Sequence, residues 1–141
     1  MTEGIYYSFI KLNLAQFATF EFNPGELLPI ELSSSFGFAY SFEDGIVCCT
    51  SDITLNQGSA PVLKAELNSY FKLQPESVLE ITDDDGSLIL PVSLMTQFAS
   101  LCYGSMRGVI YAKTMGTSLE NMVLPPCDVQ QIFTAPARFT K

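Results

Sequence analysis

The stretch from Val62 to Leu73 alternates between apolar and polar residues over almost its whole length. The apolar members, which point one way, are Leu63, Ala65, Leu67, Phe71 and Leu73. The polar members, which point the other way, are Lys64, Glu66, Asn68 and Lys72. A period of two is typical of a strand, and a strand with one polar face belongs in an antiparallel sheet with one face in water. This pattern predicts an open sheet whose other face needs a cover.

Three further parts of the chain predict strands of the same sheet. Residues 5–14 are rich in β-branched and aromatic side chains, and residues 17–22 continue this strand after a bulge or bend. Residues 35–41 alternate, with Phe36, Phe38, Tyr40 and Phe42 on one face. The turn "EDG" leads from there into a partner strand at residues 46–55. The sequence therefore predicts four antiparallel strands within about residues 5–73.

The stretch from about residue 91 to 113 predicts one long helix, which Pro91 opens. Its apolar residues follow i, i+3, i+4 spacing and are Met95, Phe98, Ala99, Cys102, Met106, Val109 and Ile110. A neighbouring face carries a ladder of small residues, namely Ser100, Gly104, Gly108 and Ala112. Each helical glycine costs roughly 1 kcal/mol relative to alanine. A helix with both a stripe and a ladder is expected to pack on two sides, with the ladder as an oligomer interface.

Composition limits the classes of partner. Apolar residues make up 48% of the 141 residues and charged residues only 16%, which fits either an oligomer or a monomer with an uncharged polar surface. Lys and Arg number 7 against 15 Asp and Glu, so nucleic acid and anionic membranes are poor partners, whereas basic unfolded chains suit it. No apolar run approaches the roughly 18 residues of a membrane span. The start lacks signal-peptide features, so we expect no membrane insertion and a cytoplasmic location.

No catalytic constellation is visible in the sequence. The chain has no histidine, no phosphate-binding loop and no zinc spacing, so we expect no enzyme activity, no cofactor and no metal. Its cysteines are Cys48, Cys49, Cys102 and Cys127. They form no C-x-x-C pair and are expected to be buried thiols, with the adjacent pair on opposite faces of a strand. The turn "TDDDGS" at residues 82–87 lacks the later ligands of a calcium loop and is expected to be solvated.

Several segments together carry a resemblance to a known family. Residues 88–108, "LILPVSLMTQFASLCYGSMRG", look like a long helix entered from an apolar-Pro step and ending in a Ser-x-Arg-Gly-like segment at residues 105–108. Residues 123–133, "VLPPCDVQQIF", look like a Leu-x-Pro return into a last helix, and residues 63–73 like a fourth strand. Over nearly its whole length the chain resembles the SecB family of protein-export chaperones. The implied fold is α+β, with a four-stranded antiparallel sheet, one long helix packed on it, and a short C-terminal helix within residues 114–141. We expect one domain over residues 1–141.

The resemblance also implies a function. SecB-family proteins pair their sheets across subunits as dimers of dimers and hold clients unfolded along apolar grooves without ATP. This implies self-association as a dimer or tetramer, unfolded polypeptide clients, and docking of the motor SecA. The implied client-binding residues are Phe22, Leu27, Leu28, Ile30, Ile132 and Phe133. The implied SecA-docking residues are Glu21 and Glu66.

Departures from the family pattern keep alternatives open. Lys64 stands beside Glu66, the return after the helix is longer, and few residues follow Phe133. These departures argue against SecA docking more than they argue against the SecB-like fold. One alternative is a SecB-like protein dedicated to a single partner, such as a chaperone of a toxin–antitoxin pair. Another is a small-molecule binder beneath Phe36, Phe38 and Tyr40, although ordinary core packing also explains these rings. The exposed-looking residues Leu27, Leu28 and Ile30 equally fit burial by a partner subunit.

Overall fold

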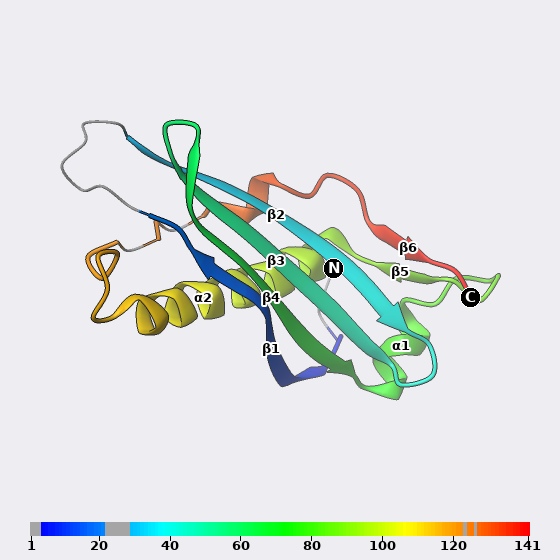
Figure 1. The fold of residues 1–141 in the computed structure, drawn as a ribbon. Coiled ribbons are helices and arrows are strands. Elements are labelled where there is room, and N and C mark those ends of the chain that lie inside the picture. Colours follow the sequence, from blue (N-terminus) through cyan, green and yellow to red (C-terminus); the bar gives the residue numbers. More distant parts are fainter. Residues whose placement is uncertain (1–3, 22–28, 123, 126) are drawn as a thin grey trace.

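Four long strands form one antiparallel sheet, in the order β1-β4-β3-β2 (Figure 1). The computed structural model of the chain describes residues 4–21, 29–122, 124–125 and 127–141. The strands of this sheet are β1 (Tyr7–Thr19), β2 (Ile30–Ser41), β3 (Ile46–Gln57) and β4 (Ala60–Leu73). The long helix α2 (Val92–Thr114) lies across one face of this sheet. The predicted α+β fold class is confirmed.

Shorter elements fill the connections and the C-terminal part. They are α1 (Pro75–Glu80), β5 (Leu88–Leu90), the single 3-10 turn η1 (Val129–Gln131) and β6 (Ala137–Phe139). The predicted short final helix is therefore only this one turn, whose cap is Asp128, with its carboxylate accepting from the Gln130 amide at 3.2 Å. β5 and β6 pair as a second, two-stranded antiparallel sheet that the sequence did not predict.

The first strand is continuous through the predicted bulge. Its register against β4 shifts between Phe9 and Lys11 and again between Leu14 and Gln16. Each shift adds one residue to β1 and turns the next side chains to the opposite face. The turn between β2 and β3 uses Gly45 at a φ of +68°, a conformation that glycine adopts without strain.

The apolar stripe of α2 packs against β3 and β4. Phe98 stacks on Phe71 with ring centroids 4.1 Å apart and planes 10° from parallel, and Tyr7 meets Phe98 edge-on at 4.8 Å. The buried residues of the helix are Leu94, Met95, Phe98, Ala99, Cys102, Tyr103, Met106, Ile110 and Thr114. Val109, predicted in this stripe, is only half-buried, because the stripe turns slightly around the helix as it follows the twisted sheet.

A small polar patch interrupts this core. The thiol of Cys102 donates to the Cys49 carbonyl at 3.4 Å, and the hydroxyls of Ser51 and Ser69 are buried with no hydrogen-bond partner among the described residues. A hydrogen bond to Cys102 and burial together raise the pKa of Cys49, so this thiol stays protonated. The expectation of buried thiols is correct for this pair but wrong for Cys48 and Cys127, which are half-buried at the margins.

The outer face of the sheet is polar, as the alternation predicts. Asp52 on β3 lies directly opposite Glu66 on β4. A hydrogen bond to Asp52 and the charge of that carboxylate raise the pKa of Glu66. The Glu66 carboxyl therefore keeps its proton to a higher pH than an isolated glutamate does.

Replacing Phe98 by alanine is expected to destabilise the fold by about 3–5 kcal/mol, because the change removes the ring stacked on Phe71 and leaves a cavity under the helix. Urea denaturation followed by circular dichroism measures this loss. Gln97→Ala, at the exposed neighbouring position, is the matched control and should change stability by no more than about 0.5 kcal/mol. Equal effects of the two changes would contradict the packing described here.

The Glu66 carboxyl is expected to titrate above its usual pKa, and Asp52→Asn should bring the midpoint back down. Because the folded pKa lies above the unfolded one, acidification through the folded value favours the folded state, with the full gain below the unfolded value. This gain should shrink in the variant. NMR titration of the side-chain carboxyl carbon measures the midpoint. Asp44→Asn removes a carboxylate from the turn between β2 and β3 and is the control. An unchanged midpoint after Asp52→Asn contradicts the assignment.

Candidate functional site

A row of half-buried aromatic side chains follows the β2 edge of the sheet. Phe36, Phe38 and Tyr40 alternate along β2 and point to the face that carries α2, and Phe42 follows in the turn. We call these four residues the aromatic row. Their register partners on β3 are fully buried, whereas the row itself remains partly open because α2 packs mainly against β3 and β4. The aromatic row is thus an apolar margin of the core that continues onto the surface.

The strand that carries the row is also an edge of the sheet. β2 pairs with β3 on one side, and no described strand pairs with it on the other. It is twelve residues long, contains no proline and has Glu31 as its one charged residue. Small residues alternate with the rings, and nothing described lies within 4 Å of a Cβ built on Gly37. A long and nearly uncharged edge of this kind can accept a further strand through its free backbone groups.

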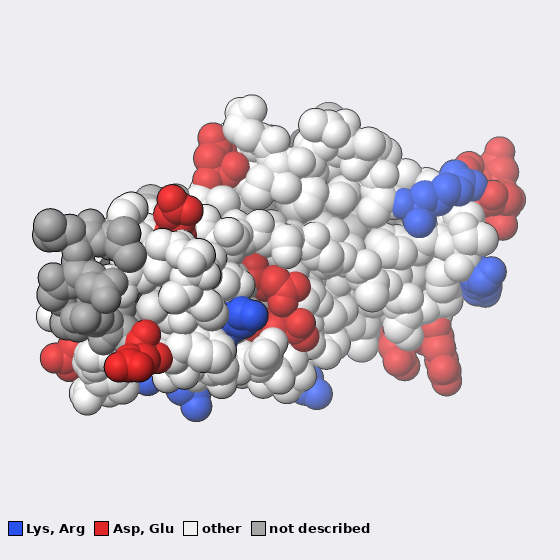
Figure 2. Space-filling view, turned by 45° about the horizontal axis from the view of Figure 1, so that its top comes forward, with Lys and Arg blue, Asp and Glu red and all other residues white. Residues whose placement is uncertain are grey.

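Charged side chains are sparse on the surface near this edge. Figure 2 shows a mostly uncharged surface, with a small central group of mixed sign. Positive and negative side chains also gather at the end where Figure 1 places the C-terminus. Among the described residues, the ion pairs at this end join Arg138 to Asp83 at 3.0 Å and to Asp85 at 2.5 Å.

The predicted client-binding residues are only partly brought together. Phe22, Leu27 and Leu28 lie outside the described residues. Ile30 begins β2 and packs, half-buried, at the end of the core that contains Leu55. Ile132 is exposed, and Phe133 reaches the aromatic row, with its ring 5.4 Å from Phe38 and 6.2 Å from Phe36.

The aromatic row itself was not predicted as a binding site. From the sequence, ordinary core packing is the preferred interpretation of its rings, and a small-molecule cavity beneath them is the alternative. The signal that distinguishes this strand lies in the residues between the rings of β2, which are serine, glycine and alanine and carry no charge. On β4 the polar alternation includes lysine and glutamate, as is usual for a solvated sheet face.

Two side chains of α2 attach the return segment that leads to the C-terminus. Tyr103 donates its hydroxyl to the Pro125 carbonyl at 2.7 Å, and Arg107 donates from Nε to the Leu124 carbonyl at 3.1 Å. Arg107 belongs to the Ser-x-Arg-Gly-like segment of the sequence. Its role within this chain is to hold the return against the helix.

The predicted SecA-docking residues lie on different parts of the surface. Glu66 sits on the outer sheet face with Asp52 opposite it and Lys64 two residues away on the same strand. Glu21 is exposed just beyond the end of β1, whereas the β1 partner of Glu66 is Gln16. Asp52 therefore adds a negative charge that the sequence comparison did not single out, and Lys64 offsets part of it.

The small-residue ladder of α2 faces away from the sheet. Its four residues, Ser100, Gly104, Gly108 and Ala112, are all exposed. A Cβ built on Gly104 or Gly108 meets no described atom within 4 Å. Tyr111, on the same side of the helix, is 54% exposed. The described part of the chain therefore does not supply the second packing surface that the two glycines predict.

A second exposed apolar surface lies along β1, the other edge of the sheet. Phe9, Ile10 and Leu12 are exposed, with Ile10 at the first register shift. Phe9 still touches the core through Phe71, at 4.7 Å between ring centroids. This edge and the small-residue ladder are thus two separate surfaces that no described residue covers.

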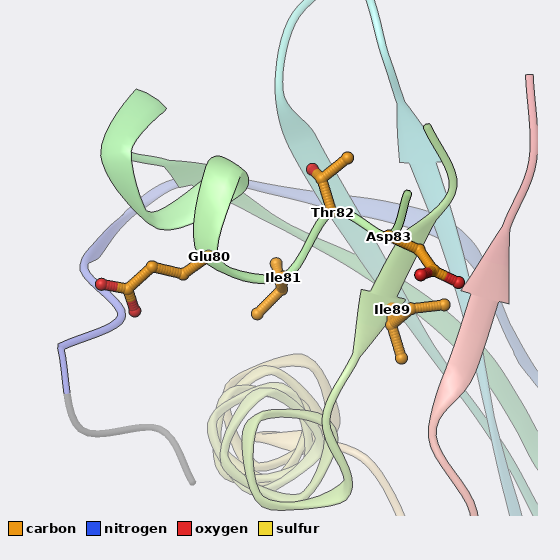
Figure 3. Close-up of a pocket in the computed structure, with 5 residues that line it drawn as sticks. All are labelled: Glu80, Ile81, Thr82, Asp83 and Ile89. Carbon is orange, nitrogen blue, oxygen red and sulfur yellow. The ribbon is translucent and has the colours of Figure 1, made fainter. Parts of the chain in front are cut away.

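A shallow hollow lies between the end of α1 and β5. It is lined by Glu80, Ile81, Thr82, Asp83 and Ile89 and has a volume of about 310 Å³ (Figure 3). Figure 3 shows Asp83 directed toward β6 and Glu80 directed away from it. Among the described residues no cluster of His, Cys, Asp or Glu is able to hold a metal ion, and no helix is long and apolar enough to span a membrane.

Comparison with known proteins identifies the fold. No family model and no curated protein matches the sequence. Among solved structures, the chain is similar to a SecB-like chaperone of Mycobacterium tuberculosis, solved in complex with a ChAD peptide from the HigA1 antitoxin. The two are 15% identical with a TM-score of 0.57, and the match covers 84% of this chain and 89% of that chain. The chain thus has the SecB-like fold that its sequence resemblance predicts.

Proposed function

We propose that the chain is an ATP-independent chaperone that binds extended segments of unfolded polypeptide along the aromatic row and the free edge of β2. The observation that carries this proposal is the coincidence of the two features on one strand. The edge offers backbone donors and acceptors to an added strand, and the row offers an apolar surface to every second side chain of that strand. Backbone pairing makes little demand on sequence, which suits a chaperone.

The charge of the chain and its fold support the same proposal. A net charge of −8 attracts basic segments, which unfolded clients of many sequences contain. The SecB-like chaperone of similar fold is bound to a peptide in its solved complex. A polypeptide ligand is therefore a better match than a small molecule, because the row is an open margin rather than an enclosed cavity.

The proposal includes two more specific functions. The first is docking of SecA on the acidic outer face through Glu66 and Glu21, to which Asp52 contributes charge. The second is dedication to one partner, such as the antitoxin of a toxin–antitoxin pair, which the peptide in the related complex favours. A native complex of fixed stoichiometry with one protein would support the second, and many substoichiometric clients would support a general holdase.

Replacing Phe38 by serine is expected to weaken binding of a permanently unfolded protein, such as reduced carboxymethylated α-lactalbumin, by about tenfold. The change removes one ring from the row, and burial of an aromatic side chain is worth on the order of 1.5–3 kcal/mol. Isothermal titration calorimetry measures the affinity, and suppression of aggregation of a heated test enzyme without ATP measures the holdase activity. Unchanged binding after Phe38→Ser contradicts the proposed site.

The matched control for this experiment is Ser35→Ala, which alters the same strand on its opposite, exposed face. Circular dichroism confirms that both variants remain folded. A peptide client that is N-methylated at every second amide tests strand addition separately, because methylation removes the donors needed for pairing with β2. Equal affinity of methylated and unmethylated peptides would leave the row as the site and exclude the edge.

We also propose that copies of the chain associate through the ladder Ser100, Gly104, Gly108 and Ala112, with the exposed β1 edge as a second contact. Two helical glycines are costly in a surface that only meets water, since alanine would serve better there. They become useful where a second backbone approaches closely. The low charged fraction of the chain fits the same assembly.

Replacing Gly104 by leucine is expected to break the oligomer and leave the subunit folded, because the position is open within the chain and leucine favours the helix by about 1 kcal/mol. Light scattering measures the mass, and circular dichroism measures the helix content. Gly104→Ala, which keeps a small side chain, is the matched control and should retain the larger mass. A leucine variant with unchanged mass would show that copies do not meet at this face.

A further inference from the structure

The chain's own C-terminal segment, residues 127–141, follows the β2 side of the molecule. After the η1 turn it extends to β6, which pairs with β5 in the register Leu88↔Phe139, Ile89↔Arg138 and Leu90↔Ala137. In Figure 1 this segment, drawn in orange to red, runs beside β2 toward the C-terminus. It lies where a further polypeptide at this edge would lie.

Side chains of this segment cover every member of the aromatic row. Phe133 packs against Phe36 and Phe38 at the distances given above. The Phe139 ring lies 6.1 Å from the Tyr40 ring, between centroids. The Lys141 amino group lies 5.6 Å from the ring centre of Phe42. The segment therefore offers two aromatic groups and one cation to the surface assigned above to clients.

From this coincidence we infer that the C-terminal segment is an intramolecular competitor, which occupies the client site and must be displaced before an extended client binds. This inference rests on the proposed function. It makes the chain autoinhibited, with the aromatic row covered between clients and exposed only when a client, or a local opening, releases residues from about 132 onward.

The contacts that hold the segment suit a reversible cover. β6 is three residues long, and its partner β5 is equally short. Arg138 of β6 forms ion pairs with Asp83 and Asp85, and the three side chains are 49%, 44% and 59% exposed. Ion pairs so accessible to solvent contribute little to stability. The base of the segment is firmer, because Val129 is buried in the core. Local opening of the end therefore need not disturb the fold.

The ion pairs also indicate which clients compete well. Arg138 lies between Asp83 and Asp85, and Figure 3 shows the Asp83 side chain directed toward β6. Hydrogen bonds from Ser87, with a smaller contribution from Arg138, lower the pKa of Asp85, so this carboxylate remains charged. A client that displaces the segment meets two unpaired carboxylates at this end. Extended segments that place a basic residue beside aromatic ones are therefore expected to bind best.

A disulfide across β5 and β6 tests the inference in the full chain. Ile89 and Arg138 are direct register partners, so the double variant Ile89→Cys/Arg138→Cys places two thiols within bridging distance of an antiparallel pair. Oxidised glutathione closes the bridge and locks the segment, while dithiothreitol opens it. The reduced form also lacks the Arg138 ion pairs, so fewer contacts hold the segment, and we call it the released form. Arg138→Cys alone, under the same oxidant, is the matched control.

The probe is a fluorescein-labelled peptide with the sequence of residues 131–141, QIFTAPARFTK, and binding is followed by fluorescence anisotropy. We expect the reduced double variant to bind at least threefold more tightly than the unaltered chain, and the oxidised form at least tenfold more weakly than the reduced form. Circular dichroism and non-reducing peptide mapping establish that both forms are folded and that the intended bridge is present.

The outcomes separate this inference from the proposed function. If the locked form binds carboxymethylated α-lactalbumin and the peptide as well as the released form does, the segment does not compete, and the inference is overturned while client binding stands. If no form binds either probe, the proposed function fails and the inference with it. Loss of binding on oxidation, with recovery on reduction only in the double variant, supports the inference.

Discussion

The contact between Phe98 and Phe71 determines which strands of the sheet α2 covers and which it leaves partly open. The stacked rings place α2 over β3 and β4, the two central strands, and the helix is too narrow to cover all four. Both edge strands therefore keep apolar side chains that α2 only partly shields. On β1 these are Phe9 and Leu12, and on β2 they are the aromatic row. The two edge surfaces to which functions are proposed above are consequences of one helix on a sheet of four strands.

The sequence predicted the elements that have a period and missed those that are too short to show one. The alternation in β4 and the helical spacing in α2 each extend over more than ten residues, so their faces and approximate bounds were predictable. β5 and β6 have three residues each, and their pairing joins positions about fifty residues apart. Such a pairing depends on how the return segment is held by Tyr103 and Arg107, which local patterns do not encode.

The candidate site was predictable only in part for a related reason. Alternation shows which face of β2 the rings occupy, but not whether a helix covers that strand. The rings of Phe36 and Phe38 could therefore be read as ordinary core. The family resemblance implies a client-binding role for Phe133, which stays a prediction, and the structure shows its ring packed against Phe36 and Phe38. Strand order decides whether the rings lie in the core or at an edge of the sheet, and the sequence alone does not give that order.

The small-residue ladder, the β1 edge and the aromatic row differ in one informative way. The small-residue ladder and the β1 edge have no cover among the described residues, whereas the aromatic row is covered by Phe133 and Phe139. An interface between permanent subunits is filled as soon as the oligomer forms, so it needs no cover of its own. A client site is empty whenever no client is bound, and an exposed aromatic strand edge then risks aggregation. In the proposed autoinhibition, a weakly held segment of the same chain removes that risk and still yields to a competing strand, and this accounts for a cover on β2.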